Sequence, residues 1–310
     1  VKIVIAETTI DGDLIGGAQT FLPKLIKGLI EKGHELHLVV KGIPNEKVSK
    51  SIMESGATLH YDIWKKKSFV QYTAPALADW VNRMEPDIYL ISASADIAWV
   101  ALPYINPGIA TLTIGHTDSE TFYLPARHYH SFLTRAIGVS HEVCNKYVAG
   151  CYLSADSVDW IPYGVEASFS VNYTNHSGSS LNLIYAGRLE ETQKRVSDLV
   201  KIAKQLSGEG IIYSLKIVGD GPEMPVLQKE LSGEIQKGSV CLFGWLEGSA
   251  VLTLLQQSEI FLLTSAYEGF SIALIEAMAN GCCPIVTNIQ SGNEQIIRHG
   301  RNGFLIEKGR

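Results

Sequence analysis

Short apolar runs alternate along the chain with segments whose apolar residues follow the spacing of one helix face. The run Val1 to Ala6 is followed by such a segment from Ala18 to Lys32. Gly33 ends that segment, and Glu35 to Val40 is the next run. Apolar runs of this length, bounded by turn residues, are typical of buried strands. The pattern therefore predicts parallel strands connected by helices that cover both faces of a sheet.

The same alternation continues through two stretches of the chain, separated by a polar segment. In the first stretch we expect further strands at 59–63, 86–91, 110–114 and 136–139, and helices at 47–54 and 74–84. In the second we expect strands at 181–186, 213–218, 240–243, 260–263, 284–287 and 304–306, with helices at 196–206, 224–231, 250–256, before 279 and at 293–298. The sequence thus predicts an α/β protein with two doubly wound Rossmann-like domains, 1–166 and 181–310, joined by a Ser- and Asn-rich linker at 167–180. We expect the two domains to face each other across a cleft.

Length, charge and cysteine content narrow the class of protein. A chain of 310 residues exceeds the usual size of one core, and 46% hydrophobic with 19% charged residues is typical of a soluble globular protein. The net charge of -6 argues against a nucleic-acid partner. Five cysteines without metal-ligand spacing indicate a reducing, cytoplasmic compartment. We expect no signal peptide and no membrane span, and the lysines at 65–67 form either a solvated loop or a peripheral contact with the inner membrane surface.

A segment with two carboxylates, EGFSIALIE, joins a predicted strand to a predicted helix. We expect Glu268 in the loop at the carboxyl end of the strand and Glu276 within the helix. The amides of Gly269, Phe270 and Ser271 would be among the unpaired donors of the helix N-terminus, which favours anions. The segment predicts a phosphate-binding turn with a carboxylate on either side. Two solvated surface carboxylates are the alternative.

Basic and glycine residues follow other predicted strands. Arg188 comes directly after the strand at 181–186, and Lys194 lies at the entrance of the next helix. A guanidinium and an ammonium together suit a diphosphate, although both could instead pair with neighbouring acids. Gly16 and Gly17 precede the first helix, where a glycine pair allows close approach of the backbone to a ligand.

Several other catalytic patterns are missing or weak. The chain has neither a dinucleotide glycine fingerprint nor a phosphate loop with Gly-Lys-Ser/Thr, which disfavours an oxidoreductase or a nucleotide hydrolase. Asp11-Gly12-Asp13 matches a metal-binding Asp pair but has no third ligand, so we interpret it as a loop. No Ser-His-Asp or Cys-His set is recognised. We expect neither a metal nor a cofactor.

The order of motifs along essentially the whole chain resembles that of the family-four retaining glycosyltransferases of the GT-B fold. The motifs are Gly16-Gly17, Gly33-His34, His116, Val139-Ser140, IPYGV at 161–165, YAGRLEETQKR, VGDGPE, EGFSIALIE, EAMANGCCPIVT, SGNEQII and NGFLI. The motifs of the second half are the more specific ones. Members of this family continue with further helices, so the resemblance implies that the second domain is truncated at Arg310.

The chain departs from the family pattern in three places. An extra residue separates Arg188 from Lys194, so Gln193 competes with Lys194 for the phosphate-binding role. We favour Lys194 because a cation suits the site. Tyr163 stands where the family commonly has Asn, and Ser271 stands where it commonly has Gly.

The resemblance implies a role for each candidate residue. Glu276 would hold the ribose hydroxyls of a nucleotide sugar, and Glu268 would contact hydroxyls of the transferred sugar. Arg188 and Lys194 would neutralise the diphosphate as it leaves. His116 would face the donor sugar near the reacting carbon, with a structural histidine as the alternative. The remaining donor contacts would come from Gly16, Gly17, Gly269, Phe270 and Ser271 at the phosphates and from Gly219 and Leu242 beside the base.

The function implied is that of a retaining, metal-independent hexosyltransferase. The N-terminal domain would bind the acceptor and the C-terminal domain the nucleotide sugar. The donor would be a UDP- or GDP-sugar, and the acceptor a hydroxyl of a glycan, a lipid-linked saccharide or a small molecule, as in polysaccharide biosynthesis. The alternatives are a non-catalytic sugar-nucleotide-binding module, a nucleotide-sugar epimerase of the GT-B fold, and a phosphorylase relative with a pyridoxal lysine.

Overall fold

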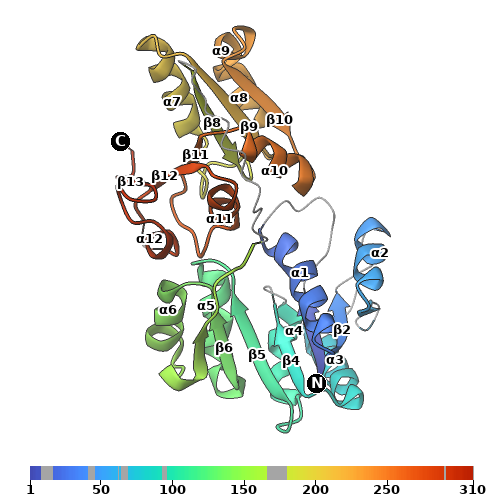
Figure 1. Cartoon of the computed structure of the whole chain (residues 1–310). Helices are drawn as coiled ribbons and strands as arrows, with labels where there is room; N and C mark the ends of the chain where they lie inside the picture. The colour runs from blue at the N-terminus through green and yellow to red at the C-terminus, as the bar shows by residue number, and fades with distance from the viewer. Residues whose placement is uncertain are drawn as a thin grey trace. The chain divides into compact units, whose positions relative to one another are not determined.

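The chain folds into two compact units, Val1–Pro162 and Tyr163–Arg310, here called the N-terminal and C-terminal units (Figure 1). The computed structural model describes residues 1–7, 17–40, 46–61, 63, 69–92, 96–165, 180–289 and 291–309. The units divide slightly before residue 166, where we expected the first domain to end. Tyr163 belongs to the C-terminal unit, and its ring lies edge-on against Phe270, with 5.9 Å between ring centroids. The expected linker at 167–180 lies outside the described residues except for Ser180.

The N-terminal unit contains a seven-stranded parallel sheet in the order β3-β2-β1-β4-β5-β6-β7. Its strands are β1 (Lys2–Glu7), β2 (Glu35–Val40), β3 (Thr58–His60), β4 (Ile88–Ile91), β5 (Ala110–Gly115), β6 (Arg135–Gly138) and β7 (Val158–Trp160). Its α-helices are α1 (Gly17–Glu31), α2 (Glu46–Glu54), α3 (Val70–Met84), α4 (Asp96–Ala101), α5 (Glu120–Tyr129) and α6 (His141–Cys151). The sequence pattern predicts all of these elements except α4, α5, α6 and β7.

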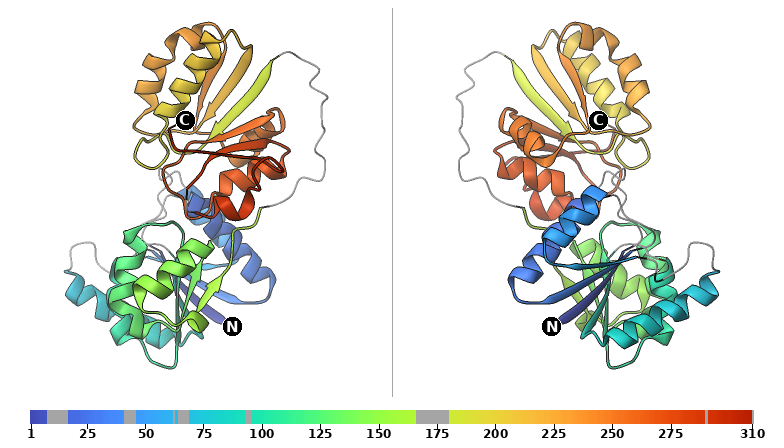
Figure 2. Two further views of the ribbon diagram at one scale, coloured as in Figure 1. Left: turned by 90° about the vertical axis from the view of Figure 1, so that its left-hand side faces the viewer. Right: turned by 90° about the vertical axis from the view of Figure 1, so that its right-hand side faces the viewer.

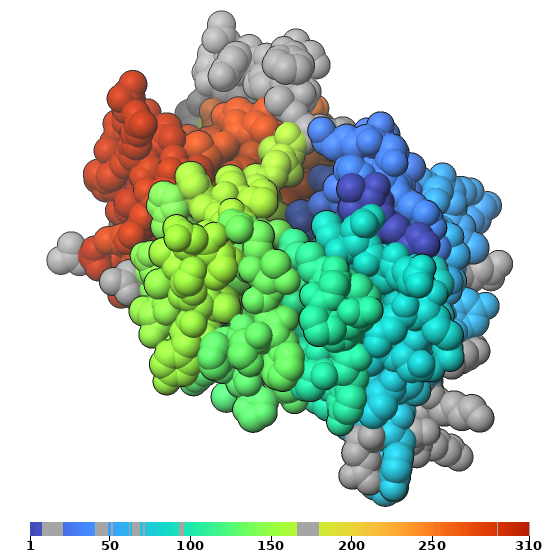
Figure 3. Space-filling model, turned by 90° about the horizontal axis from the view of Figure 1, so that it is seen from below, coloured from blue at the N-terminus to red at the C-terminus, as the bar shows by residue number. Residues whose placement is uncertain are grey.

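The middle of the N-terminal sheet is buried on both faces. Ile3, Val4, Ile5 and Ala6 of β1 are all buried, and β1 pairs in parallel with β2 and β4. A strand covered on both sides reads as a continuous apolar run rather than an alternating one, which is why β1 is recognisable in the sequence. Figure 2 shows helices on both sides of this sheet, and Figure 3 shows the surface that they present, from the cyan of α3 to the yellow-green of α6.

The C-terminal unit contains a six-stranded parallel sheet in the order β10-β9-β8-β11-β12-β13. Its strands are β8 (Leu181–Ala186), β9 (Tyr213–Val218), β10 (Val240–Gly244), β11 (Ile260–Leu263), β12 (Cys283–Thr287) and β13 (Phe304–Ile306). Its α-helices are α7 (Ser197–Gly208), α8 (Met224–Glu230), α9 (Ser232–Gln236), α10 (Gly248–Gln256), α11 (Ile272–Ala279) and α12 (Asn293–Ile296). Helix α12 ends before residue 298, where we expected its end, because Ile297 is extended and the amide of Arg298 donates to the side chain of Asn302 at 2.6 Å.

Strand β8 contributes alternate side chains to two separate cores. Leu183 and Tyr185 pack in a cluster with residues of α7 and α8 on one face of the sheet. Ile184 and Ala186 pack in a second cluster with residues of α10 and α11 on the other face. Successive side chains of a strand point to opposite faces, so two helical layers must cover β8. This three-layer arrangement confirms the doubly wound architecture predicted for this half of the chain.

The strand order reverses beside β8, which lies between β9 and β11. In open parallel sheets, ligands bind outside the carboxyl ends of the strands at such a reversal, because the connections on either side run in opposite directions. The loop that contains Arg188 follows β8, and the loop that contains Glu268 follows β11. The fold therefore brings these two predicted site segments to the same edge of the sheet.

Candidate active site

Glu268 is a buried carboxylate of the C-terminal unit that accepts three hydrogen bonds. It lies in the loop between β11 and α11 and is only 5% exposed. Its Oε1 accepts hydrogen bonds from Lys194 Nζ at 2.5 Å and from Ser265 Oγ at 2.6 Å. A buried carboxylate is stable as an anion only when a cation or several donors compensate it, and here both are present. The structure thus joins two predicted site residues in an ion pair that the sequence did not reveal.

Gln193 approaches the other oxygen of the same carboxylate. Its Nε2 lies 3.3 Å from Glu268 Oε2 and 3.3 Å from the carbonyl oxygen of Tyr267. Gln193 and Lys194, the two candidates for one role in the sequence, therefore each contact a different oxygen of Glu268.

Sequence reasoning missed Ser265 and Thr264. Ser265 is fully buried beneath Glu268, and Thr264 Oγ1 donates to the carbonyl oxygen of Lys194 at 2.7 Å. The signal available in the sequence was a pair of hydroxyl residues directly after a buried strand, next to a loop carboxylate.

The turn before α11 has the form of an anion-binding site. Ser271 is the N-cap of α11, and its Oγ accepts from the amide of Leu274 at 3.3 Å. Among the described residues, the amides of Gly269, Phe270 and Ser271 donate to no other group. Unpaired amides at a helix N-terminus attract anions. Glu276 lies in the second turn of the same helix and is half-buried.

Two glycine loops at the ends of β8 and β9 pack directly against each other. The amide of Gly187 donates to Val218 O at 3.0 Å, and the amide of Gly219 donates to Gly244 O at 2.8 Å. Gly219 has a φ of 134°, and a Cβ on it would lie 1.8 Å from the carbonyl oxygen of Gly187. Only glycine fits there, so this residue type is required by the close approach of the two loops.

Of the other two predicted contacts of the C-terminal unit, only Arg188 lies at this edge of the sheet, whereas Leu242 lies within β10 and packs against the core cluster shared with α7 and α8. Arg188 is exposed directly after β8, and its carbonyl oxygen accepts from Tyr185 OH at 2.8 Å. Leu242 is half-buried in β10, next to β9.

His116 is the predicted site residue of the N-terminal unit. It follows β5, is buried, and lies with its ring edge-on between Phe21 and Phe122 at centroid distances of 5.3 and 6.0 Å. Its Nε2 is 3.4 Å from Ser92 Oγ. Burial lowers the pKa of His116 to about 4, although a hydrogen bond with the backbone of Ser92 opposes this shift. The imidazole is therefore neutral near pH 7 and offers a hydrogen bond rather than a charge.

The predicted glycine pair of the N-terminal unit is described only in part. Gly17 is the first residue of α1, whereas Gly16 and the loop with Asp11 and Asp13 lie outside the described residues. That His116 and Gly17 contact the donor stays a prediction.

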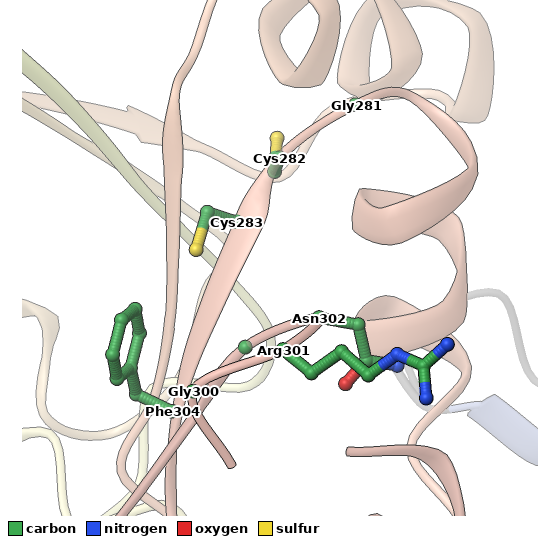
Figure 4. A pocket seen from close by; sticks show the side chains of 8 residues that line it. Gly281, Cys282, Cys283, Gly300, Arg301, Asn302 and Phe304 are labelled. Atoms are coloured by element: carbon green, nitrogen blue, oxygen red, sulfur yellow. The ribbon is translucent and has the colours of Figure 1, made fainter. Parts of the chain in front are cut away.

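A surface hollow of about 280 Å³ lies at the opposite edge of the C-terminal sheet (Figure 4). It is lined by Gly281, Cys282, Cys283, Gly300, Arg301, Asn302, Gly303 and Phe304, at the amino ends of β12 and β13. The side chain of Asn302 already bonds the backbone of Arg298 and Ile296. Ligands of parallel sheets bind at the carboxyl ends of the strands, so the Glu268 edge is favoured over this hollow as the ligand site.

The described residues contain no group of three or more His, Cys, Asp or Glu side chains arranged to hold a metal ion. Within the same residues, no helix has both the length and the apolar character needed to cross a bilayer.

Comparison with known proteins points to one class of enzyme. Residues 172–310 match the family described as "Glycosyl transferases group 1". The chain is 27% identical over 247 residues to a lipopolysaccharide 1,6-galactosyltransferase of Escherichia coli strain K12, an alignment that covers 76% of this chain and 65% of that protein. It is 26% identical over 317 residues to the N-acetyl-alpha-D-glucosaminyl L-malate synthase of Bacillus anthracis, covering 95% of this chain and 81% of the relative. The first alignment thus spans just under two thirds of the relative's length.

Solved structures give the fold of the whole chain. The apo form of the lipopolysaccharide outer core galactosyltransferase WaaB has a TM-score of 0.78 at 20% identity, covering 100% of this chain and 87% of that one. Anabaena HepE in complex with UDP-glucose has a TM-score of 0.75 at 15% identity, covering 100% and 86%. These neighbours have the GT-B fold, and so has this chain.

Proposed function

Residues 172–310 belong to the group 1 glycosyl transferases, in a chain of GT-B fold. From this premise we propose that the protein transfers a sugar from a nucleoside-diphosphate-sugar to an acceptor hydroxyl. One observation carries this proposal. At the strand-order reversal of the C-terminal unit, the largely buried Lys194–Glu268 pair joins the loop after β8 to the loop after β11, directly before the amides of Gly269, Phe270 and Ser271, which have no partner among the described residues. This arrangement offers positive charge, amide donors and a carboxylate at one edge of the sheet.

Different parts of the donor would be bound by different groups of this site, according to the chemistry of each group. The amides before α11 and the exposed Arg188 would bind the diphosphate, because both donate hydrogen bonds to phosphate oxygens. Glu276 would accept hydrogen bonds from the two ribose hydroxyls, and Glu268 from hydroxyls of the transferred sugar. Gly219 and Leu242 would border the base. Lys194 would add positive charge near the leaving group, where electrostatic stabilisation contributes most to the rate.

The reaction would proceed with retention and without a metal ion. The bond between the anomeric carbon and the diphosphate breaks, the acceptor oxygen bonds to the same face of that carbon, and the acceptor proton passes to a departing phosphate oxygen. His116, neutral at pH 7, would orient the donor sugar through a hydrogen bond, while Gly16 and Gly17 would contact phosphate from the N-terminal unit. The N-terminal unit would also bind the acceptor.

UDP-sugars and glycan acceptors are the first choices within this proposal. HepE was solved in complex with UDP-glucose, and another relative is named UDP-Gal:alpha-D-GlcNAc-diphosphoundecaprenol alpha-1,3-galactosyltransferase. Relatives named for lipopolysaccharide and for phosphatidyl-myo-inositol support a glycan or a lipid-linked saccharide as the acceptor. GDP-sugars and small-molecule acceptors remain within the same class of reaction.

We further propose that the protein acts in the cytoplasm at the inner surface of the membrane. Phe69 and Tyr72, at the start of α3, are 73% and 66% exposed. The lysines at 65–67 lie two residues before Phe69 in the sequence. Aromatic side chains beside a basic segment suit an anionic bilayer surface.

The decisive test combines binding with turnover. The chain should bind UDP or GDP in calorimetry, should bind one of their hexose derivatives more tightly, and should release the nucleotide when an acceptor glycan is added. Binding without release under any acceptor would support the non-catalytic module. Conversion of UDP-N-acetylglucosamine without an acceptor would support the epimerase. No binding of either nucleotide would remove the proposal altogether.

A further inference from the structure

The segment Gln193–Lys194 has a backbone that is fixed on the loop after β11. The amides of Gln193 and Lys194 both donate to Glu190 Oε1, at 2.8 and 3.1 Å. In the other direction, Gln193 O accepts from the amide of Ala266 at 2.6 Å, and Lys194 O accepts from Thr264 Oγ1 at 2.7 Å. Two hydrogen bonds to Glu190 thus fix the backbone of these two residues within their own loop, and two more hold it against the loop that contains Glu268.

The side chain of Gln193 is held much more weakly than its backbone. Both hydrogen bonds of Nε2, to Glu268 Oε2 and to Tyr267 O, are 3.3 Å long, beyond the usual range for N–H···O bonds. Among the described residues, its Oε1 accepts no hydrogen bond. A side chain with long bonds on a fixed backbone can exchange its partner for a ligand at little cost in free energy.

The two oxygens of Glu268 are used unequally. Oε1 accepts two short hydrogen bonds, from Lys194 Nζ and Ser265 Oγ. Oε2 accepts only the long bond from Gln193 among the described residues. Each carboxylate oxygen has two lone pairs. Oε2 thus keeps a free acceptor position directly beside the Gln193 donor.

We infer that Gln193 determines the donor sugar, because Gln193 Nε2 and Glu268 Oε2 together recognise one sugar hydroxyl. That hydroxyl donates to Oε2 and accepts from Nε2. A hydroxyl fulfils both conditions with a single atom, whereas in an acetamido group the nitrogen only donates and the carbonyl oxygen only accepts, and an ether oxygen only accepts. The inference rests on the proposed function and narrows it: the donor is a hexose with a free hydroxyl at the position facing Glu268, and sugars that are deoxy or acetamido there are rejected.

The test uses Gln193→Leu in the full chain, with Gln205→Leu as the matched control. Gln205 lies on the exposed side of α7 and bonds Glu209 at 2.9 Å, away from the site. Calorimetry gives the Kd of UDP and GDP and of their glucose, galactose and mannose derivatives. The readout is the Kd of the free nucleotide divided by the Kd of the nucleotide sugar. Gln193→Leu should change the nucleotide Kd by less than about twofold but reduce this ratio by roughly 3- to 10-fold, the value of one hydrogen bond.

A donor that lacks one hydroxyl identifies the position that is recognised. The deoxy donor missing that hydroxyl loses both hydrogen bonds, so it should bind the wild type at least as weakly as the full donor binds Gln193→Leu, and Gln193→Leu should cost nothing further with that deoxy donor. If Gln193→Leu and Gln205→Leu give equal ratios, the inference is wrong while the proposed function stands. If the wild type binds no nucleotide, the proposed function itself fails. Gln193→Asn, which keeps the amide but shortens its reach, must show the same loss, and it replaces Gln193→Leu if that variant does not fold.

Discussion

At the scale of single residues, the pair formed by Lys194 and Glu268 decides how the site is held together. Both side chains are largely buried, with exposed fractions of 18% and 7%. Replacing one partner leaves the other charged and uncompensated, which is more costly than removing both. The sequence predicted both residues for the donor site but gave no sign that they contact each other, because they are far apart along the chain.

Lys194→Met should therefore lower both stability and turnover. We expect the free energy of unfolding to fall by about 3 kcal/mol, measured by urea unfolding, because Glu268 loses its cation. Lys194→Met with Glu268→Gln should restore most of that loss but should not restore turnover, which we expect to be reduced roughly 10²-fold. Lys201→Met is the control, since Lys201 pairs with Asp198 on the surface at 2.8 Å and is 71% exposed. Equal stability of the Lys194 and Lys201 variants would contradict this view.

His116 should make the stability of the chain depend on pH. Its pKa is about 4 in the folded protein, below the ordinary value of 6.5, so between these values the unfolded chain binds more protons. Stability should therefore fall as the pH falls from about 6.5 to about 4, by up to roughly 3 kcal/mol from this group. The pKa of His60 is also lowered, mainly by burial, and acts in the same direction.

The check is the slope of unfolding free energy against pH. His116→Asn should flatten this slope without abolishing it, because His60 still contributes. A His116→Asn variant with an unchanged slope would mean that the imidazole is not kept neutral by burial.

At the scale of elements, the contact between the loops after β8 and β9 leaves no space for a side chain. Gly219→Ala should destabilise the chain by about 2 kcal/mol or more, because its φ is positive and its Cβ would overlap Gly187 O. Nucleotide binding should weaken as well, since the loop of Arg188 would be displaced. Gly233→Ala is the control: it lies in α9 with nothing within 4 Å of the added Cβ, and Ala is the better helix former. Thermal unfolding and calorimetry on both variants give the comparison.

The elements show why some of this fold could be predicted and some could not. The bounds of β8, β9, β11 and β13 agree with the sequence pattern, because these strands are short apolar runs that end at turn residues. Helix α5 was missed: it has Pro125 inside it, and only Tyr123 and Ala126 are buried. β7 is a short edge strand without a fully buried residue, so it leaves no apolar run.

The residues of the site, like the elements, could be predicted only where the signal is local in the sequence. Glu268, Lys194 and the turn before α11 were predicted because carboxylates, cations and glycines after strands are visible locally. The contacts of Ser265 and Gln193 with Glu268 were not, since they depend on the order of the strands and on side-chain packing. The family resemblance and the α/β class with two doubly wound sheets were both confirmed.

At the scale of the whole molecule, membrane contact can be measured directly. The protein should bind vesicles that contain anionic lipid, and Phe69→Ser with Tyr72→Ser should weaken this binding roughly 10-fold, because two large apolar side chains are lost from the interface. Tyr152→Ser is the control, at a tyrosine that is 70% exposed in the same unit. Added salt should weaken binding of the wild type through the lysines at 65–67. Binding that is unaffected by the double variant would exclude this surface.

The Lys194–Glu268 contact also bears on how the protein behaves among the anions of a cell. An ammonium with a carboxylate 2.5 Å away acts at a distance as a dipole, whose field declines much faster than that of a free charge. Inorganic phosphate or sulfate would gain little from Lys194 on approach. Small anions should therefore compete poorly for this position. The molecule that occupies it would be selected by short-range contacts, through hydroxyls that bind Glu268.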